Sequence, residues 1–414
     1  MAAGKGNSNR DFLTSNEVVE KLGISKSTLY AYVSRGLIQS EPDPDSPRSR
    51  RYRADDVDRL MNRQKMRSDP EHASTTALDW GSPVLESSIS AISDERLAYR
   101  GQDAVRLARE HSFEEVTALL WTGSLDADLP EPDATTAHVR DVLVRQSSVL
   151  VHSLEPTARM QMLLPVLEQR DPRSFDFRPE SVQRAGRGIL QLATACLTGT
   201  EGNSGIARTL QAHWAAGNPE AARLIDTALI LCADHELNIS TFTVRCIASA
   251  RTPLYSAVTG GVSAMHGQKH GGATRQAEAM LDEVGSPDRA YEVLRNRLQR
   301  GEDLAGFGHR LYPSGDPRGA ALLEAIADSN VGAGGSLELV QAVSSAANEL
   351  QGASPNLDIA LVTLCRALDQ PAGTAEAVMT LGRMSGWIAH AIEEYERDQL
   401  IRPRARASDS SQEG

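Results

Sequence analysis

Residues 306–318 read GFGHRLYPSGDPR, and this stretch interrupts a chain that otherwise favours helices. Two comparable interruptions lie on either side of it, MHGQKHGGAT at 265–274 and SPNLDIA at 354–360. Each of the three places one titratable side chain beside Gly, Pro or Asn, where backbone can approach a ligand closely. These side chains are His270, His309 and Asp358. The three segments are therefore the first candidates for a functional site.

The sequence around these segments has the periodicity of helices. LAREHSFEEVTALLWTG (107–123), ARLIDTALILCA (222–233) and LDIALVTLCRAL (357–368) place apolar residues at steps of three and four. Aromatic residues make up only 4% of the chain and strand-like alternation is scarce, whereas sheets favour aromatic and β-branched residues. There is no repeat of fixed period, and no Gly-rich phosphate loop follows a strand. From residue 83 onward the sequence predicts a large all-α body.

Charge is unevenly distributed over the 414 residues, whose formal net charge is −12. Residues 1–70 hold 13 Lys and Arg against 10 Asp and Glu, while the remainder holds 30 against 45. A mildly basic head on an acidic body indicates different partners for the two parts. The first ten residues lack the apolar core of a secretory signal, and no run approaches the roughly 18 apolar residues of a membrane span. The four cysteines are far apart and have no metal-ligand spacing, so we expect a reduced, cytoplasmic protein that is not inserted in a membrane.

The head contains the signals of two short helices joined by a glycine turn. Thr14 and Glu17 have capping-box spacing, and Gly23 is placed to end the first helix. Ser25 can cap a second helix, which Gly36 would stop. Such a pair is a helix-turn-helix. A Pro-rich segment with four arginines (41–53) and a further predicted helix (54–65) follow.

This stretch resembles the MerR/excisionase-type winged helix-turn-helix over about 55 residues, in a pattern running from "T-x-x-E-V-A-x-x-L-G-I-S" to "R-x-Y-x-x-x-D-V". The resemblance implies that the second helix enters the major groove and that wing arginines contact phosphate. The DNA-binding residues would be Ser25, Lys26, Ser27, Thr28, Tyr30, Arg48, Arg50 and Arg51. The alternative is a helical adaptor that keeps the shape but binds protein. Because phosphate neutralisation needs clustered arginines, duplex DNA is the favoured partner.

The three segments that interrupt the body resemble the motifs of citrate synthases. That family carries "P-L-H-G-G-A-N", "G-F-G-H-R-V-Y-x-x-x-D-P-R" and "P-N-V-D" in this order and at similar separations. SSISAISDERLAYRGQ (87–102), ADHELNISTF (233–242) and GRMSGWIAH (382–390) also match family segments. The resemblance covers about 320 residues, nearly everything after the predicted linker.

The resemblance implies an all-α, two-lobed citrate synthase fold preceded by a small winged helix-turn-helix domain. We expect the helix-turn-helix domain at 10–66, a linker at 67–82, the synthase domain at 83–405 and a disordered tail at 406–414. The large lobe would combine 83–271 with 371–405, and the small lobe would be 272–370. The active site would lie in the cleft between the lobes.

The implied reaction condenses acetyl-CoA with oxaloacetate and water to citrate and CoA, as in the tricarboxylic acid cycle. The methyl group of acetyl-CoA must lose a proton, and the resemblance assigns this to the carboxylate of Asp358. His270 would stabilise the enolate oxygen, and His309 would polarise the keto acid. The groups that bind the oxaloacetate dianion would be His235, Arg318, Arg383 and Arg402. The residues at the CoA would be Gly306, Phe307, Gly308 and Arg310.

The family also implies an assembly. Its counterpart of Arg402 reaches the neighbouring subunit's site, so a homodimer or larger assembly is expected. Acetyl-CoA enters as a substrate, and no cofactor or metal is expected beyond it.

Several alternatives remain open from the residues themselves. His266 and His270 are four apart and could share a metal on a helix, but no HExxH glutamate accompanies them and glycines follow at once. Asp358 could simply be a helix N-cap. Arg383 and Arg402 could close helix ends near two glutamates, at 393 and 394.

Three positions depart from the family pattern. Thr274 replaces a usual Asn, Lys269 replaces a small or apolar residue, and Pro313 stands where a basic residue near the CoA phosphates is common. The Thr274 change bears on the geometry of the loop, and the Pro313 change on CoA affinity.

Two other functions fit the same resemblance. 2-Methylcitrate synthase differs by one methylene in its substrate, which a pocket discriminates by only ~1–3 kcal/mol. A transcription regulator could use the synthase fold to sense an acyl-CoA or a keto acid, with the head binding DNA.

Overall fold

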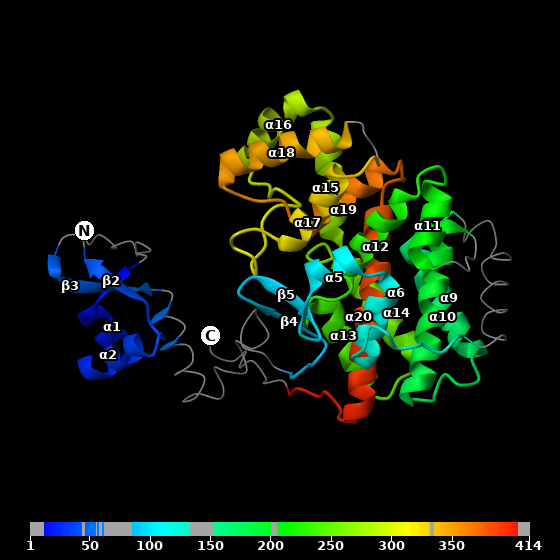
Figure 1. The fold of residues 1–414 in the computed structure, drawn as a ribbon, viewed down its shortest axis with the longest axis horizontal. Helices are drawn as coiled ribbons and strands as arrows, with labels where there is room; N and C mark the ends of the chain where they lie inside the picture. Colours follow the sequence, from blue (N-terminus) through cyan, green and yellow to red (C-terminus); the bar gives the residue numbers. More distant parts are fainter. Residues whose placement is uncertain are drawn as a thin grey trace, which may run out of the picture. The chain divides into compact units, whose positions relative to one another are not determined.

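The structure is a computed structural model of the whole chain. It describes residues 12–43, 46–54, 56–57, 60–61, 85–132, 153–199, 205–331 and 335–404. The chain divides into two compact units, Met1–Glu86 and Ser87–Gly414, which we call the head and the body (Figure 1). The predicted linker and tail lie outside the described residues.

The head contains a helix-turn-helix, as the sequence predicts. Its elements are β1 (Phe12–Thr14), α1 (Ser15–Leu22), α2 (Lys26–Ser34), β2 (Ser40–Asp43) and β3 (Ser46–Arg53). Thr14 and Glu17 form the capping box, and Gly23 ends α1 with a φ of 62°. Ser25 caps α2 by accepting a hydrogen bond from the Thr28 amide. The helices pack on a small core of Val18, Leu22, Leu29, Ile38, Tyr52 and Val57.

The Pro- and Arg-rich segment of the head forms a wing. β3 pairs antiparallel with both β1 and β2, so the strand order is β1-β3-β2. Most of the helix predicted over 54–65 lies outside the described residues. Asp56, which is described, is buried and accepts a hydrogen bond from the Gln39 amide at 2.7 Å.

The body is built almost entirely of helices, which confirms the predicted all-α class. These helices are α5 (Ala104–Glu110), α6 (Phe113–Thr122), α9 (Pro156–Arg170), α10 (Pro179–Thr198), α11 (Ile206–Trp214), α12 (Glu220–Cys232), α13 (Ile239–Ser249), α14 (Leu254–Met265), α15 (Gly272–Val284), η1 (Pro287–Arg289), α16 (Ala290–Gln299), α17 (Pro317–Ala327), α18 (Ser336–Gln351), α19 (Leu357–Ala367) and α20 (Thr374–Arg397). None of the described helices is both long and apolar enough to cross a membrane.

The described part of the body also contains a small antiparallel sheet before α5. It consists of β4 (Ser90–Ser93), β5 (Arg96–Tyr99) and β6 (Gln102–Asp103) in that order. Strands of two to four residues are too short to show alternation in the sequence, which explains why the pattern did not predict them.

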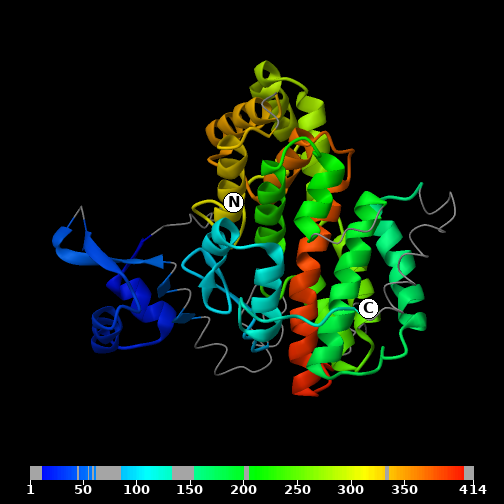
Figure 2. The same ribbon diagram turned by 45° about the vertical axis from the view of Figure 1, so that its right-hand side comes forward.

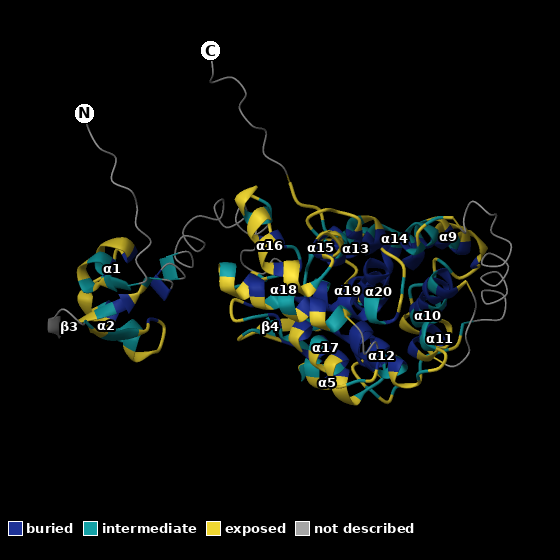
Figure 3. Ribbon diagram, turned by 90° about the horizontal axis from the view of Figure 1, so that it is seen from above, coloured by how far each residue is buried: buried dark blue, intermediate teal, exposed yellow. Residues whose placement is uncertain are grey.

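Helix α20 forms the centre of the body. It contacts α6, α9, α10, α12, α13, α14, α15 and α19, and Figure 2 shows it running between these helices. Its residues from Thr374 to Ile392 are all buried, so every side of the helix packs against other parts of the body. Figure 3 shows buried residues gathered around α20, with exposed ones on the outer helices.

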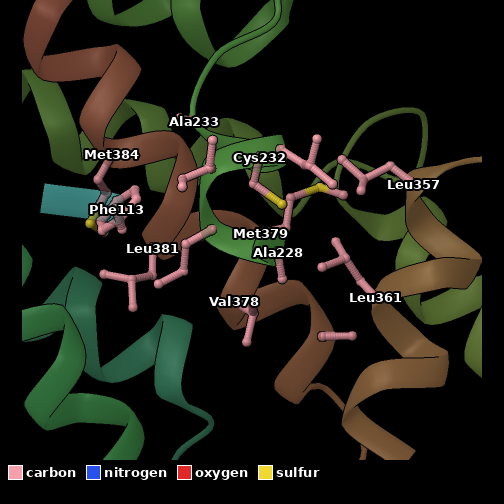
Figure 4. Packing of buried hydrophobic residues seen from close by; sticks show 14 of the residues in the cluster. Phe113, Ala228, Cys232, Ala233, Leu357, Leu361, Val378, Met379, Leu381 and Met384 are labelled. Atoms are coloured by element: carbon pink, nitrogen blue, oxygen red, sulfur yellow. The ribbon is translucent and has the colours of Figure 1, made fainter. Parts of the chain in front are cut away.

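Glycines on α20 allow the end of α12 to approach closely. A Cβ on Gly386 would lie 2.3 Å from the carbonyl oxygen of Ala233, and one on Gly382 would lie 2.7 Å from Cys232 Cβ. Figure 4 shows side chains of α12, α19 and α20 packed together in this region, with Cys232 and Met379 near Leu357. This close approach brings the end of α12, the start of α19 and the middle of α20 to one place.

Candidate active site

Two of the three segments that interrupt the helical pattern, 306–318 and 354–360, are paired through their backbones. The Gly308 amide donates to Ser354 O at 2.8 Å, and the Asn356 amide donates to Gly306 O at 2.9 Å. Gly306 and Gly308 have φ values of 86° and 73°, and a Cβ on Gly306 would lie 2.7 Å from Ile359 Cβ. The pairing therefore needs glycine at 306, and it holds the loop before α17 against the start of α19.

Asp358 lies on the first turn of α19. The N-cap of that helix is Asn356, whose side chain accepts from the Asp358 amide at 2.9 Å. The alternative that Asp358 is itself the cap is therefore wrong. Its carboxylate Oδ1 accepts from Thr274 Oγ1 at 2.7 Å. Burial raises the pKa of Asp358, although the Thr274 hydrogen bond and the charge of Arg318 oppose this.

The rings of His309, His235 and Tyr312 lie close to one another. The two imidazole centroids are 5.2 Å apart, and His235 Nε2 lies 2.9 Å from the Tyr312 hydroxyl. The Leu311 amide donates to His309 Nδ1 at 3.1 Å. In the neutral ring of His309 the proton is then on Nε2.

All three candidate histidines are neutral near pH 7. Burial, followed by the charge of Arg318, lowers the pKa of His309 to about 4. Burial and then Arg383 lower the pKa of His270 to about 4, so the cation responsible is Arg383 and not the adjacent Lys269. The pKa of His235 is also well below its usual value, because the ring is buried near both arginines.

Arg318 and Arg383 supply buried positive charge to the same place. Arg318 donates from Nε and Nη2 to the two carboxylate oxygens of Asp316, at 3.0 and 2.9 Å. Arg383 donates from Nε to the carbonyl of Cys232 at 2.7 Å. Its pKa is lowered by burial, and Asp234 opposes this. Arg318 and Arg383 thus place two buried guanidinium groups where they can bind the oxygens of a carboxylate.

His270 is held by the start of α13. Its Nε2 lies 2.9 Å from Ser240 Oγ, and that hydroxyl also lies 2.7 Å from Asn238 Oδ1. Trp387 Nε1 donates to the same oxygen at 3.2 Å. The hydroxyl proton therefore has two possible acceptors, and its position selects the tautomer of His270.

His266 does not share a site with His270. It lies at the end of α14, and its Nδ1 is 3.1 Å from Glu376 Oε1, whereas His270 bonds to Ser240. The two histidines thus have separate partners, one on α20 and one on α13.

Two of the predicted residues, Arg402 and Arg310, are exposed. Arg402 is exposed and lies beyond the end of α20. Arg383 is 14 residues before that end, a rise of about 21 Å along the helix. The glutamates considered as partners for these arginines, Glu393 and Glu394, pair instead with the buried Arg245. Arg310 is exposed on the loop that also carries His309.

Several residues support the site although the sequence did not predict this role for them. Tyr312, Asp316, Ser240 and Thr274 contact the predicted groups directly. Asp234 also belongs to this set, since its charge opposes the lowering of the Arg383 pKa by burial, and its Oδ2 lies 3.1 Å from the buried His390 Nε2. Only Asp316 carries a local signal, because an Asp before a Pro is typical of a helix start, and it does cap α17.

The candidate DNA-binding residues of the head fall into two groups. Ser25, Ser27 and Thr28 bond to one another at the start of α2, where Ser25 Oγ lies 2.7 and 2.8 Å from the two other hydroxyls. Lys26 and Tyr30 are exposed on the same helix, Tyr30 to 57%.

The wing arginines differ in how far their charge is compensated. Arg51 pairs with Glu41 and stacks on the Phe12 ring at 4.3 Å. Arg50 is exposed and, among the residues that the structure describes, it bonds to neutral atoms of Ser40, at 2.9 and 3.0 Å. The Arg48 side chain lies outside the described residues. Arg50 therefore offers the more available positive charge.

Comparisons with known proteins match both units. The family model "Citrate synthase, C-terminal domain" matches residues 77–404, and a "Helix-turn-helix domain" model matches residues 12–65. Citrate synthase 2 of Bacillus subtilis is 30% identical over 347 residues, 78% of this chain and 93% of that protein. Citrate synthase of Haloferax volcanii is 33% identical, with the same coverage. 2-Methylcitrate synthase 2 of Corynebacterium glutamicum is 28% identical over 74% of this chain and 87% of that protein.

Solved structures resemble the body as well. Citrate synthase from Thermotoga maritima aligns with a TM-score of 0.63 and 26% identity, over 79% of this chain and 94% of its own. The ternary complex of carboxymethyl coenzyme A and oxaloacetate with the Thermoplasma acidophilum citrate synthase aligns with a TM-score of 0.64 and 22% identity, over 80% of this chain and 95% of its own, which shows a likeness of fold.

Proposed function

Because the chain belongs to the citrate synthase family of acyltransferases, we propose that it condenses acetyl-CoA with oxaloacetate and water to give citrate and CoA. The observation that carries the proposal is the convergence of the half-buried Asp358 carboxylate, three neutral histidines and two buried arginines. This set contains a base, proton donors and an anion clamp, which are the groups that a carbon–carbon condensation through an enolate requires.

In the proposed reaction, Asp358 takes a proton from the methyl carbon of acetyl-CoA. Its raised pKa makes it a stronger base than an exposed carboxylate. When the Ser240 hydroxyl donates to His270 Nε2, the proton of His270 is on Nδ1, which can donate to the thioester oxygen as it gains enolate charge. An added Cβ on Gly308 would meet nothing within 4 Å, so the loop leaves room for CoA at this residue.

The second substrate would be bound and activated by the other half of the site. His309, with its proton on Nε2, donates to the keto oxygen of oxaloacetate and makes the carbon more electrophilic. Arg318 and Arg383 bind its carboxylates, assisted by His235. The enolate carbon then attacks the keto carbon, and water cleaves the resulting thioester to release CoA.

A thiol-release assay tests this proposal. The purified protein should release CoA from acetyl-CoA only when oxaloacetate is present. Propionyl-CoA and butyryl-CoA in parallel measure the chain-length preference, and a clear preference for propionyl-CoA would replace citrate by 2-methylcitrate as the product. No CoA release with any of the three would refute the catalytic proposal.

The site would be completed by a second copy of the chain, which supplies Arg402. Two observations support a homodimer. Arg402 lies far from Arg383 within one subunit, and α9 and α13 expose apolar side chains, with Met162 at 45%, Val166 at 41% and Ile239 at 62%. Mixing Arg402→Ala and Asp358→Asn variants should regenerate activity in exchanged heterodimers. Failure of verified heterodimers to regain any activity would show that each subunit works alone.

The helix-turn-helix match supports a second proposed function, binding of duplex DNA by the head. Arg50→Ala should reduce the salt dependence of binding by roughly one unit, because one phosphate contact is lost. Arg51→Ala should reduce it less, since Glu41 already compensates that charge. Fluorescence anisotropy against salt measures both, and a binding-site selection with and without the two substrates tests whether the body acts as a sensor. Absence of salt-sensitive binding would favour the protein adaptor.

A further inference from the structure

The base proposed above has a single side-chain partner in the part of the chain that the structure describes. Thr274 Oγ1 donates to Asp358 Oδ1 at 2.7 Å, and Thr274 is only 1% exposed. It lies on the first turn of α15, whose first residue is Gly272, while Asp358 lies on the first turn of α19. The contact therefore joins two helix starts.

The position of Thr274 in the chain gives this contact a consequence for geometry. α15 begins two residues after His270, so the segment that carries the proposed enolate-stabilising histidine also carries the hydroxyl that holds the base. One hydrogen bond to Oδ1 fixes the plane of the carboxylate and leaves Oδ2 as the oxygen that can accept a proton. A base and a donor held by one short segment keep their relative positions.

The same contact has a consequence for basicity. Burial raises the pKa of Asp358, and the hydrogen bond from Thr274 lowers it, because the hydroxyl favours the ionised carboxylate. When Oδ2 takes a proton from the substrate carbon, the carboxylate loses its charge and the bond from Thr274 becomes weaker. The hydroxyl thus reduces basicity while it maintains orientation.

We propose that Thr274 is a positioning residue for the proton-abstracting carboxylate of Asp358. The proposal rests on the function proposed above. It also gives a reason for a hydroxyl where related sequences usually carry Asn, since either side chain can donate one hydrogen bond to a carboxylate. Thr274 makes no chemical step itself.

Two variants separate this role from simple packing. Thr274→Val keeps the shape but removes the donor, whereas Thr274→Ser keeps the donor. For Val we expect kcat to fall about 10-fold and the acidic limb of its pH profile to move upward by about one unit, as for the loss of one charge-assisted hydrogen bond. The KM for oxaloacetate should stay unchanged, and Ser should restore both the rate and the profile.

Thr363→Val is the matched control. Thr363 is a fully buried threonine on α19, the helix that carries Asp358, and its hydroxyl bonds to the Ile359 carbonyl at 2.7 Å. It should leave the pH profile in place. An unshifted profile in Thr274→Val, or an equal shift in the control, would overturn the proposal.

A second measurement does not depend on turnover. Infrared titration of protein labelled at the aspartate carboxyl carbons, with Asp358→Asn to identify the band, reports the carboxyl group itself. The pH midpoint of the Asp358 titration should be higher in Thr274→Val than in the wild type. Equal midpoints would refute the hydrogen bond between Thr274 and Asp358. If the wild type makes no product, the proposed function fails, yet this titration still decides the role of Thr274.

Discussion

Replacing Asp316 by Asn tests how the site holds its buried positive charge. Asp316 is 3% exposed, and its carboxylate accepts from the Arg318 amide, from the Arg318 guanidinium and, at 3.2 Å, from the Leu357 amide. It therefore caps α17, neutralises Arg318 and ties α17 to the start of α19. Asn keeps the size and can still cap a helix, so the substitution mainly removes the charge.

The expected cost follows from the burial of the pair. Arg318 is 5% exposed and has Asp316 as its ion-pair partner. Removing one partner of a buried pair leaves an uncompensated charge, which costs ~3–5 kcal/mol. Because Asn retains the cap and one acceptor oxygen, we expect the lower end, about 3 kcal/mol of unfolding free energy.

Urea unfolding of the body, followed by tryptophan fluorescence, measures this cost. Asp328→Asn is the control, because Asp328 is exposed at the other end of α17, and its change should stay within about 0.5 kcal/mol. Oxaloacetate should stabilise Asp316→Asn more than the wild type, since a dianion would supply the missing negative charge. Equal urea midpoints for the wild type and Asp316→Asn would refute the expected cost of breaking the Arg318–Asp316 pair. Equal stabilisation of the two proteins by oxaloacetate would refute binding of the substrate by Arg318.

Three further predictions concern stability. Burial lowers the pKa of His270 and His309 to about 4, while an unfolded histidine titrates near 6.5, so the unfolded chain binds more protons between these values. Going from pH 7 to pH 5 should therefore cost about 2 kcal/mol per histidine, and flat urea midpoints across this range would contradict it. Gly386→Ala should cost about 3 kcal/mol, because its Cβ would lie 2.3 Å from a backbone carbonyl, whereas Gly217→Ala, with nothing within 4 Å, should change the midpoint little. Burial raises the pKa of Asp358, so its ionised form destabilises the fold at pH values above that pKa. Asp358→Asn should therefore raise the thermal unfolding midpoint at pH 7, while it lowers turnover ~100-fold because the base is lost. A lower thermal midpoint than that of the wild type would contradict this.

Features set by neighbours in the sequence could be predicted well. The capping box of Thr14 and Glu17, the stop at Gly23 and the cap at Ser25 each depend on residues within one turn, and all three are present. The helical class followed from periodicity over ten or more residues. The short β4–β6 sheet did not, because its strands contain too few residues to show a period.

Contacts between distant residues could not be predicted in this way. The GRMSGWIAH segment places Gly382, Gly386 and His390 four residues apart, which indicates one face of a helix but not what that face meets. In the structure it meets the end of α12, where His390 pairs with Asp234 from 156 residues earlier. From the sequence, Thr274 was only a departure that bears on the geometry of its loop. Its hydrogen bond to Asp358, 84 residues away, is visible only in the structure.

The protonation of the site depends on such distant contacts most of all. An unperturbed histidine has a pKa near 6.5 whatever its motif. Motif matching therefore does not tell whether His235, His270 and His309 are neutral or protonated near pH 7. Their neutral state arises because packing buries the rings and places the guanidinium groups of Arg318 and Arg383 near them. A neutral imidazole can present one N–H to an oxygen and accept at its other nitrogen, as His309 does from the Leu311 amide. The capacity of these rings to donate to a substrate oxygen near pH 7 is thus a property of the folded body and not of any one motif.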